Sequence, residues 1–140
     1  MGFTELLIIL VVSFPLIIIP AAAFCRIFVK AGKPWWAALI PFYNYVVLCE
    51  IIEMPGWAAI FISLAVIIPV VKDFFLNISG GLKAIGFILY IVSIMFYIAS
   101  DMELAKRFGK SEAWGFFLIC MFYFIGLPIL GFGKAEYRKQ

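Results

Sequence analysis

The sequence predicts an all-α integral membrane protein, a single domain over residues 1–140 in which about five helices form a transmembrane bundle. The first observation behind this prediction is composition: 66% of the 140 residues are hydrophobic and only 14% are charged. The mean hydropathy is +1.15, whereas an average soluble domain is about 45–50% apolar and about 25% charged. A short chain needs a polar surface to remain in water, so we expect lipid to be its solvent.

The second observation is the spacing of the charge-free runs. They cover 20, 16, 17, 17 and 21 residues, at 6–25, 34–49, 55–71, 84–100 and 113–133. A membrane helix needs about 20 apolar residues, with about 17 as the lower limit. The first and last runs meet this length. The middle three meet it only if the flanking charged residues lie partly in the membrane and extend their charged groups toward its surface. The alternative is four spans plus one re-entrant or interfacial segment.

The first run contains Pro15 and Pro20, each of which removes a backbone donor and displaces the carbonyl four residues earlier. Kinked spans persist where neighbouring helices satisfy the freed groups, so we expect this helix to be kinked and packed against others. Glu5 precedes the run and no basic residue does. A cleavable signal peptide needs positive charge there, so the start favours an anchor with its N-terminus outside.

The second run places a helix breaker and an amide near its centre. Pro41 cannot donate to the carbonyl of Ala37, and an unpaired amide in lipid is expensive. We therefore expect the side chain of Asn44 to hydrogen-bond to another helix or to that carbonyl, in a kink fixed by helix packing or in a ligand site. The candidate interaction motif is Trp36, Pro41, Tyr43, Asn44 and, from the third run, Trp57.

The remaining runs are bounded by recognisable strings. The third begins with MPGWAA at 54–59, which echoes KPWWAA at 33–38. Proline starts helices, tryptophan marks membrane interfaces and alanine permits close packing. In the five-span arrangement the two strings enter from opposite faces, which is also the relation between the halves of inverted-repeat transporters. The fourth and fifth runs flank a charged loop at 101–112.

Basic residues in short loops indicate orientation, because they are enriched on the cytoplasmic side. With the N-terminus outside, five spans leave only Lys106, Arg107 and Lys110 outside. The eight predicted inside are Arg26, Lys30, Lys33, Lys72, Lys83, Lys134, Arg138 and Lys139. The re-entrant alternative divides them six to five. The five-span arrangement is therefore favoured, with loop 101–112 outside and the C-terminus inside.

No catalytic constellation is found in the sequence. The chain has no histidine, so Ser-His, Cys-His and HExxH chemistry and histidine-containing metal sites are excluded. Asp73 and Asp101 are the only aspartates, and one predicted span separates them, which argues against an aspartyl pair. The acids lie at span ends, and the basic residues are dispersed rather than clustered as in a nucleic-acid groove. We expect no enzyme, no cofactor, no metal and no nucleic-acid partner.

Four blocks of the sequence resemble a family of small bacterial membrane proteins of unknown function. They are KAGKPWWAALIPFYNYVVL at 30–48, MPGWAAI at 54–60, ELAKRFGKS at 103–111 and LPILGFGKAEY at 127–137. Members of that family often carry an automatic signal peptidase I label, and they usually lack the extra residues present here at about 72–90. The Ser–Lys pairs that such a label requires would be Ser79 with Lys83 or Ser111 with Lys110. Those lysines lie in loops where they stay hydrated and protonated, so we reject the label.

The resemblance and the composition together predict a multi-pass protein of the bacterial cytoplasmic membrane. We expect it to act as an interaction, accessory or scaffold subunit, with the lipid bilayer and another membrane protein or a second copy of itself as partners. The alternative is a small oligomeric transporter or channel. Ionisable groups inside spans usually mark such pathways, and the predicted spans contain none.

Overall fold

The computed structural model describes residues 2–70 and 80–139, and within these ranges every regular element is helical. Val71, Asp73 and Ser79, considered above as a span end and as candidate catalytic groups, lie outside these ranges. The elements in chain order are α1 (Phe3–Lys30), the 3-10 helix η1 (Trp35–Leu39), α2 (Tyr43–Ile51), α3 (Ala58–Val70), α5 (Gly80–Arg107), α6 (Glu112–Trp114), the π-helix η2 (Gly115–Met121) and α7 (Tyr123–Phe132). The all-α prediction is confirmed.

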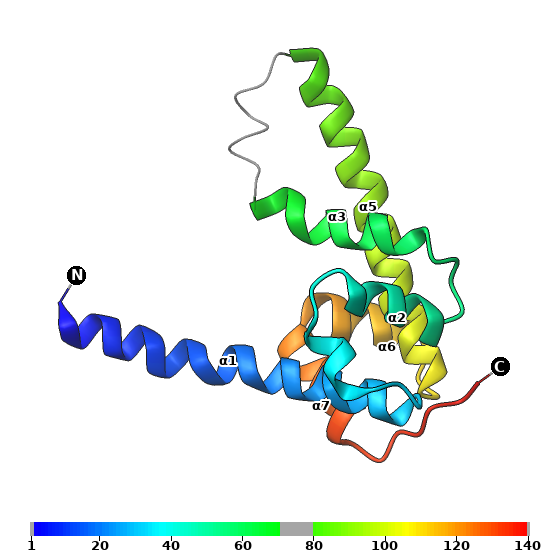
Figure 1. The fold of residues 1–140 in the computed structure, drawn as a ribbon, viewed down its shortest axis with the longest axis horizontal. Coiled ribbons are helices and arrows are strands. Elements are labelled where there is room, and N and C mark those ends of the chain that lie inside the picture. The colour runs from blue at the N-terminus through cyan, green and yellow to red at the C-terminus, as the bar shows by residue number, and fades with distance from the viewer. Residues whose placement is uncertain (1, 71–79, 140) are drawn as a thin grey trace.

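Two long helices project from a packed centre in different directions (Figure 1). The N-terminal part of α1 forms one projection, and the N-terminal part of α5, accompanied by α3, forms the other. Both helices have 28 residues, or about 42 Å at 1.5 Å per residue. They are long and apolar enough to cross a membrane. The five-span prediction therefore holds only in its coarser form, an all-helical chain with apolar helices of membrane-spanning length.

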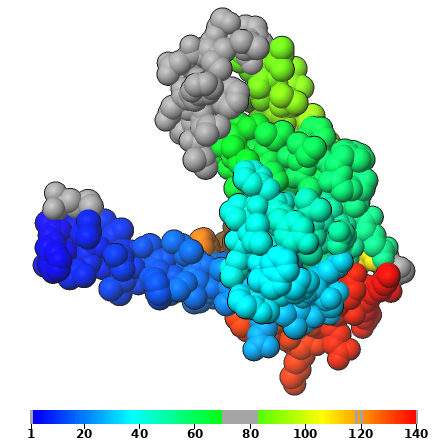
Figure 2. Space-filling model, in the orientation of Figure 1, coloured from blue at the N-terminus to red at the C-terminus, as the bar shows by residue number. Residues whose placement is uncertain are grey.

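The first helix continues through both prolines. Gly2 N–H donates to the Glu5 carboxylate at 3.1 Å, which satisfies an N-terminal donor and places negative charge where the helix dipole favours it. Pro15 and Pro20 lie within the unbroken element. Of the two, only Pro20 is buried. The expected packing against other helices is thus limited to the C-terminal third of α1, and Figure 2 shows the N-terminal part standing clear of the rest.

The second predicted span is not one helix. After η1 the backbone is extended at Ile40, and Phe42 takes a positive φ of 66° before α2 begins. Pro41 disfavours helical geometry at the preceding residue and cannot donate to the turn before it. Lys33 and Glu50, the charged residues on either side of this run, form an ion pair with an N–O distance of 2.5 Å. Residues 34–49 therefore turn back on themselves, and the predicted kink at Pro41 is a break.

The fifth predicted span is also divided. The chain changes direction at Phe122, whose φ of −123° and ψ of 57° interrupt the helix between η2 and α7. Glu112, which precedes this run, pairs with Lys106 at 2.7 Å. Gly133, which ends it, accepts a hydrogen bond from Lys30 at 2.8 Å. The third run forms the short helix α3 of 13 residues, whereas the fourth extends seven residues beyond its predicted end at Ser100, to Arg107.

The packed centre joins the C-terminal halves of α1 and α5 to η1, α2, η2 and α7. Its largest fully buried side chains include Phe28, Ile27 and Leu130. α1 and α7 approach so closely at Gly131 that a Cβ added there would lie 2.8 Å from the Cα of Ala23. Small residues permit such backbone contact between helices in membranes. A second cluster packs α3 against α5.

Candidate functional site

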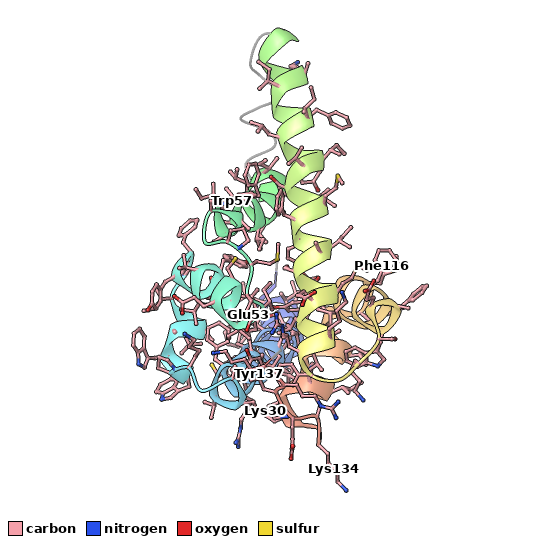
Figure 3. All side chains as sticks on the ribbon, turned by 90° about the vertical axis from the view of Figure 1, so that its right-hand side faces the viewer. Lys30, Glu53, Trp57, Phe116, Lys134 and Tyr137 are labelled. Atoms are coloured by element: carbon pink, nitrogen blue, oxygen red, sulfur yellow. The ribbon has the colours of Figure 1, made fainter. Side chains whose placement is uncertain are left out.

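A polar network lies where the C-terminal ends of α1, α5 and α7 meet. The Lys30 ammonium donates to the carbonyl oxygens of Leu130, Gly133 and Ala135 at 2.7, 2.8 and 2.9 Å. The last carbonyls of a helix have no partner within it, and a cation there also complements the helix dipole. Figure 3 shows Lys30 near Lys134 and Tyr137 at this end of the molecule. One lysine from α1 therefore caps α7 and holds the C-terminal tail.

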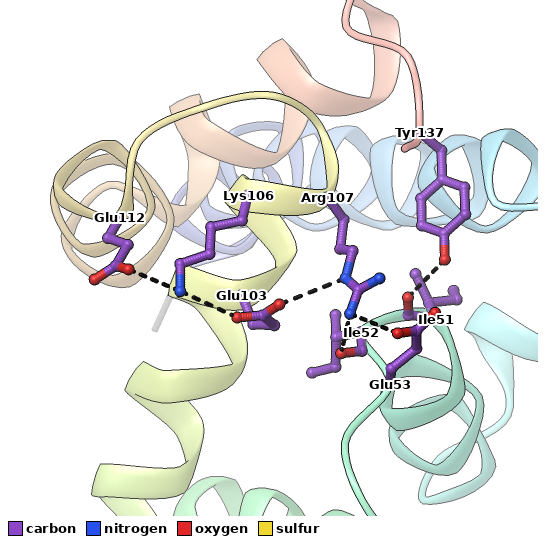
Figure 4. Close-up of polar contacts among 8 residues, drawn as sticks. All are labelled: Ile51, Ile52, Glu53, Glu103, Lys106, Arg107, Glu112 and Tyr137. Carbon is purple, nitrogen blue, oxygen red and sulfur yellow. Dashed lines mark hydrogen bonds and ion pairs between the residues drawn. The ribbon is translucent and has the colours of Figure 1, made fainter. Parts of the chain in front are cut away.

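Arg107 is the most buried charged residue of this network, with 4% of its surface exposed. Its Nη2 donates to the carbonyl of Ile52 at 3.2 Å and to the Glu53 carboxylate at 3.0 Å, and its Nε lies 3.5 Å from Glu103 (Figure 4). The Arg138 N–H donates to the Arg107 carbonyl at 2.6 Å. Arg107 therefore connects α5 to the α2–α3 loop and to the C-terminal tail.

These contacts overturn one part of the predicted topology. The loop 101–112 and the C-terminal residues were expected on opposite faces of the bilayer. A hydrogen bond between Arg138 and Arg107 cannot form across a hydrocarbon core about 30 Å thick. The predicted placement on opposite faces is wrong. It assumes that every charge-free run crosses the membrane, whereas the runs at 34–49 and 113–133 both turn back.

A cavity of about 350 Å³ lies beside this network, between α1, α2, α5 and α7. Its walls are mainly apolar, but polar side chains enter from three helices: Asn44 and Tyr45 from α2, Tyr97, Ser100 and Asp101 from α5, and Tyr123 from α7. Asp101 is 5% exposed. Its Oδ2 atom and the Oδ1 atom of Asn44 are buried and accept no hydrogen bond from the described part of the chain. We regard this cavity as the candidate functional site.

The position of Asp101 differs from the sequence expectation, which put every acid at the end of a span. α5 continues for six residues past Asp101, about 9 Å at 1.5 Å per residue. Asp101 is therefore an interior residue of the helix, and its side chain faces the packed centre. A signal for this was present. Leu104, Ala105 and Phe108 follow Asp101 at intervals of three, four and seven residues and are also buried, which is the spacing of one helix face.

The predicted interaction motif does not form one site. The rings of Trp36 and Tyr43 stack with centroids 6.0 Å apart. Both rings remain about half exposed, and Pro41 is exposed. Trp57 packs edge-on against Phe96 of α5, at 5.3 Å. Of the motif residues, only Asn44 lines the cavity. The Oδ1 atom of Asn44 accepts no hydrogen bond from another helix of the described chain, whereas a bond to the freed carbonyl would be donated by Nδ2 and stays a prediction.

Replacing Asn44 by leucine should raise the free energy of unfolding by about 1 kcal/mol, because a buried polar atom with no partner carries an uncompensated desolvation cost. Leucine has a similar volume and suits the apolar walls of the cavity. Thermal unfolding of the purified protein in mild detergent measures the change. A loss of more than about 1 kcal/mol would mean that the amide has a stabilising partner. Val46→Leu, an exposed apolar change on the same helix, serves as the control.

The described part of the chain is thus all-helical, with two helices of membrane-spanning length and a mainly apolar cavity, which a few polar side chains enter, near their C-terminal halves. Among the described residues, no three His, Cys, Asp or Glu side chains form a group that could hold a metal ion. The chain belongs to the family of unknown function DUF5684, whose model matches residues 36–140. The match includes the cavity residues of α2, α5 and α7 and excludes α1. No curated protein and no solved structure matches the chain.

Proposed function

We propose that the protein is a multi-pass component of the bacterial cytoplasmic membrane that acts as an interaction or accessory subunit, with no catalysis of its own. The observation that carries this proposal is the exposed N-terminal part of α1. Ile8, Ile9, Leu10 and Val11 are 64, 55, 55 and 67% exposed. Four consecutive residues at 3.6 per turn cover the whole circumference of a helix, so this part of α1 is apolar and uncovered on every side. Such a helix requires lipid, a partner helix or both.

The proline at position 15 supports a protein partner in addition to lipid. Pro15 lies in this uncovered part of α1 and cannot donate to the carbonyl of Val11. In hydrocarbon an unsatisfied carbonyl costs several kcal/mol, and prolines in membrane helices are tolerated where neighbouring helices or hydroxyl side chains compensate. The hydroxyl of Ser13 is directed to Ile9 and Leu10 instead. A second helix beside Pro15 would supply the missing compensation.

A photoreactive amino acid at Val11 tests this proposal in cells. We expect one discrete protein adduct, recovered in mild detergent at near-stoichiometric yield and identified by mass spectrometry. Placing the same photoreactive residue at Lys139, in the exposed C-terminal tail, should not give that adduct. Exclusive labelling of lipid from Val11 would count against a partner and leave α1 as a membrane anchor alone.

The distribution of basic residues supports a topology with the packed end in the cytoplasm. Three Lys or Arg residues lie in each of the segments 26–33, 106–110 and 134–139, and contacts among Lys30, Arg107 and the C-terminal tail hold these segments at one end. Lys83 lies near the opposite end of α5. Because basic loops remain in the cytoplasm, we assign that end to the cytoplasmic side and the N-terminus to the outer side. The segments 34–49 and 113–133 then enter from the cytoplasm and return to it.

Reporter fusions should distinguish this topology from the five-span arrangement. A fusion after Gly109 and a fusion after Gln140 should both show cytoplasmic activity, because Arg138 and Arg107 are hydrogen-bonded neighbours. A fusion before Phe3 should show external activity. Opposite locations for the first two fusions would restore the five-span arrangement and would contradict the packing of the tail against α5.

A small transporter is the second candidate function, and Asp101 is the observation that favours it. Ionisable residues within membrane helices are costly and commonly mark ion or solute pathways. Asp101 lies within one of the two helices of membrane-spanning length and lines the cavity. Liposomes containing the purified protein should then show a solute or ion flux that Asp101→Asn abolishes. An unchanged flux in that variant would remove the support that Asp101 gives to transport.

A further inference from the structure

The cavity carries two hydrogen-bond acceptors that nothing in the described chain satisfies. Asp101 Oδ2 comes from α5 and Asn44 Oδ1 from α2, and both residues line the same space. Native proteins rarely leave buried polar atoms without partners, and each exception calls for an explanation. Asn44 Oδ1 can only accept, and Asp101 Oδ2 accepts when the carboxyl is ionised, so a group that satisfies both atoms in that state is a hydrogen-bond donor.

In its ionised form, Asp101 has no counter-ion among the described residues that line the cavity, because none of them is a Lys or Arg. Basic side chains of the packed end have other partners: Lys30 donates to three carbonyl oxygens, Lys106 pairs with Glu103 and Glu112, and Arg107 pairs with Glu53 through Nη2, while its Nε and Nη1 form no hydrogen bond with the described residues. A buried carboxylate is normally paired with a cation or coordinates one. The complementary donor is therefore expected to carry positive charge.

The remaining walls select the kind of cation. Phe24, Tyr45, Tyr123 and Phe124 contribute aromatic rings, and aliphatic side chains from α1 and α7 complete the lining. Aromatic faces attract organic cations, and apolar walls favour a ligand with an apolar body. A divalent metal ion would require several oxygen ligands, and the part of the lining that the structure describes contains one carboxylate. The volume of about 350 Å³ is near the lower end of the range for small-molecule sites, about 300–1,000 Å³.

We infer that this cavity is a binding site for a small organic cation, a protonated amine attached to an apolar body. The ammonium group donates to Asp101 and Asn44, and the apolar body occupies the space lined by the aromatic rings. This site is independent of the proposed interaction through α1, because it lies at the C-terminal half of that helix and uses residues of α2 and α5.

The test uses the full-length protein in lipid nanodiscs and the probe 2-(4-fluorophenyl)ethylamine, with binding followed by fluorine NMR. The matching alcohol, 2-(4-fluorophenyl)ethanol, has the same body without the charge. We expect saturable binding of the amine and at least about tenfold weaker binding of the alcohol. Asp101→Asn keeps the shape of the side chain and removes its charge, so it should weaken amine binding at least about tenfold while leaving the alcohol unaffected.

Two further variants complete the design. Asn44→Leu removes the second acceptor and should also weaken amine binding, in a protein expected to be at least as stable as the original. Glu136→Gln removes a carboxylate from the exposed C-terminal tail and should leave binding unchanged.

Equal affinities for the amine and the alcohol would overturn the inference, and so would undiminished amine binding by Asp101→Asn, since Asp101 would then act only as a neutral packing group. Absence of amine binding together with saturable binding of sodium or potassium ions would overturn the inference and assign the site to an inorganic cation. If Asp101→Asn loses amine binding but still gives the protein adduct from the photoreactive residue at Val11, the cavity and the partner surface on α1 are two separate sites.

Discussion

The free energy of unfolding should fall by about 3 kcal/mol when Arg107 is replaced by alanine. The side chain is 5% exposed and joins α5 to the carbonyl of Ile52 and the carboxylate of Glu53. Ile52 is itself 1% exposed, so water cannot replace the donor that its carbonyl loses. Glu53 is more accessible and can recover hydration, which keeps the expected loss at the lower end of the range for a broken buried pair. Titration with a denaturing detergent, followed by circular dichroism, measures the change.

Lys33→Ala provides the matched control for Arg107→Ala. It also removes a cation that pairs with a glutamate, but Lys33 and Glu50 are 35% and 55% exposed. Exposed pairs contribute about 0–1 kcal/mol, so Lys33→Ala should change stability by no more than that. Arg107→Met keeps the aliphatic volume and should fall between the two. If Arg107→Ala cost no more than Lys33→Ala, the network of Figure 4 would not stabilise the fold.

The all-helical class was predictable from the composition and from the lengths of the charge-free runs. Both features reflect the lipid that surrounds the chain, so reading them requires no knowledge of tertiary contacts. The number of crossings was not predictable in the same way. Counting residues cannot distinguish a run that crosses from one that turns back at Pro41 or Phe122. The turn before α2 requires a positive φ at Phe42, a conformation that is uncommon for any residue except glycine. The ion pair of Lys33 with Glu50 joins the two ends of the run, and it can form only because the chain makes that turn.

Of the two polar residues that define the candidate site, the sequence indicates Asn44 but not Asp101. Asn44 drew attention because an amide in an apolar run must be satisfied or used. Ending the span at its first charge places Asp101 outside it, although α5 continues to Arg107 and the spacing of buried residues continues to Phe108. That these two residues share one cavity depends on the packing of α2 beside α5. No local pattern encodes that packing.

Gly131→Val should lower the free energy of unfolding by about 3 kcal/mol and loosen α1 from α7. A Cβ added at Gly131 would lie 2.8 Å from the Cα of Ala23 and 3.0 Å from its carbonyl carbon. These are backbone atoms, so no side-chain rotation can relieve the contact. Overpacking of this kind costs about 1–3 kcal/mol, and the branched valine is at the upper end. Gly131→Ala should lose less, because it adds only the Cβ.

The comparison with Gly56 separates this steric effect from the general consequences of replacing glycine. Gly56 precedes α3, its φ is not in the left-handed region, and nothing lies within 4 Å of an added Cβ. Gly56→Val should therefore change stability by no more than about 0.5 kcal/mol. In Gly131→Val the separation of α1 from α7 should also release the carbonyls held by Lys30, so the C-terminal tail should become sensitive to protease in native conditions. Equal effects at the two glycines, or a tail that stays protected in Gly131→Val, would mean that α1 is held by contacts other than its close approach to α7.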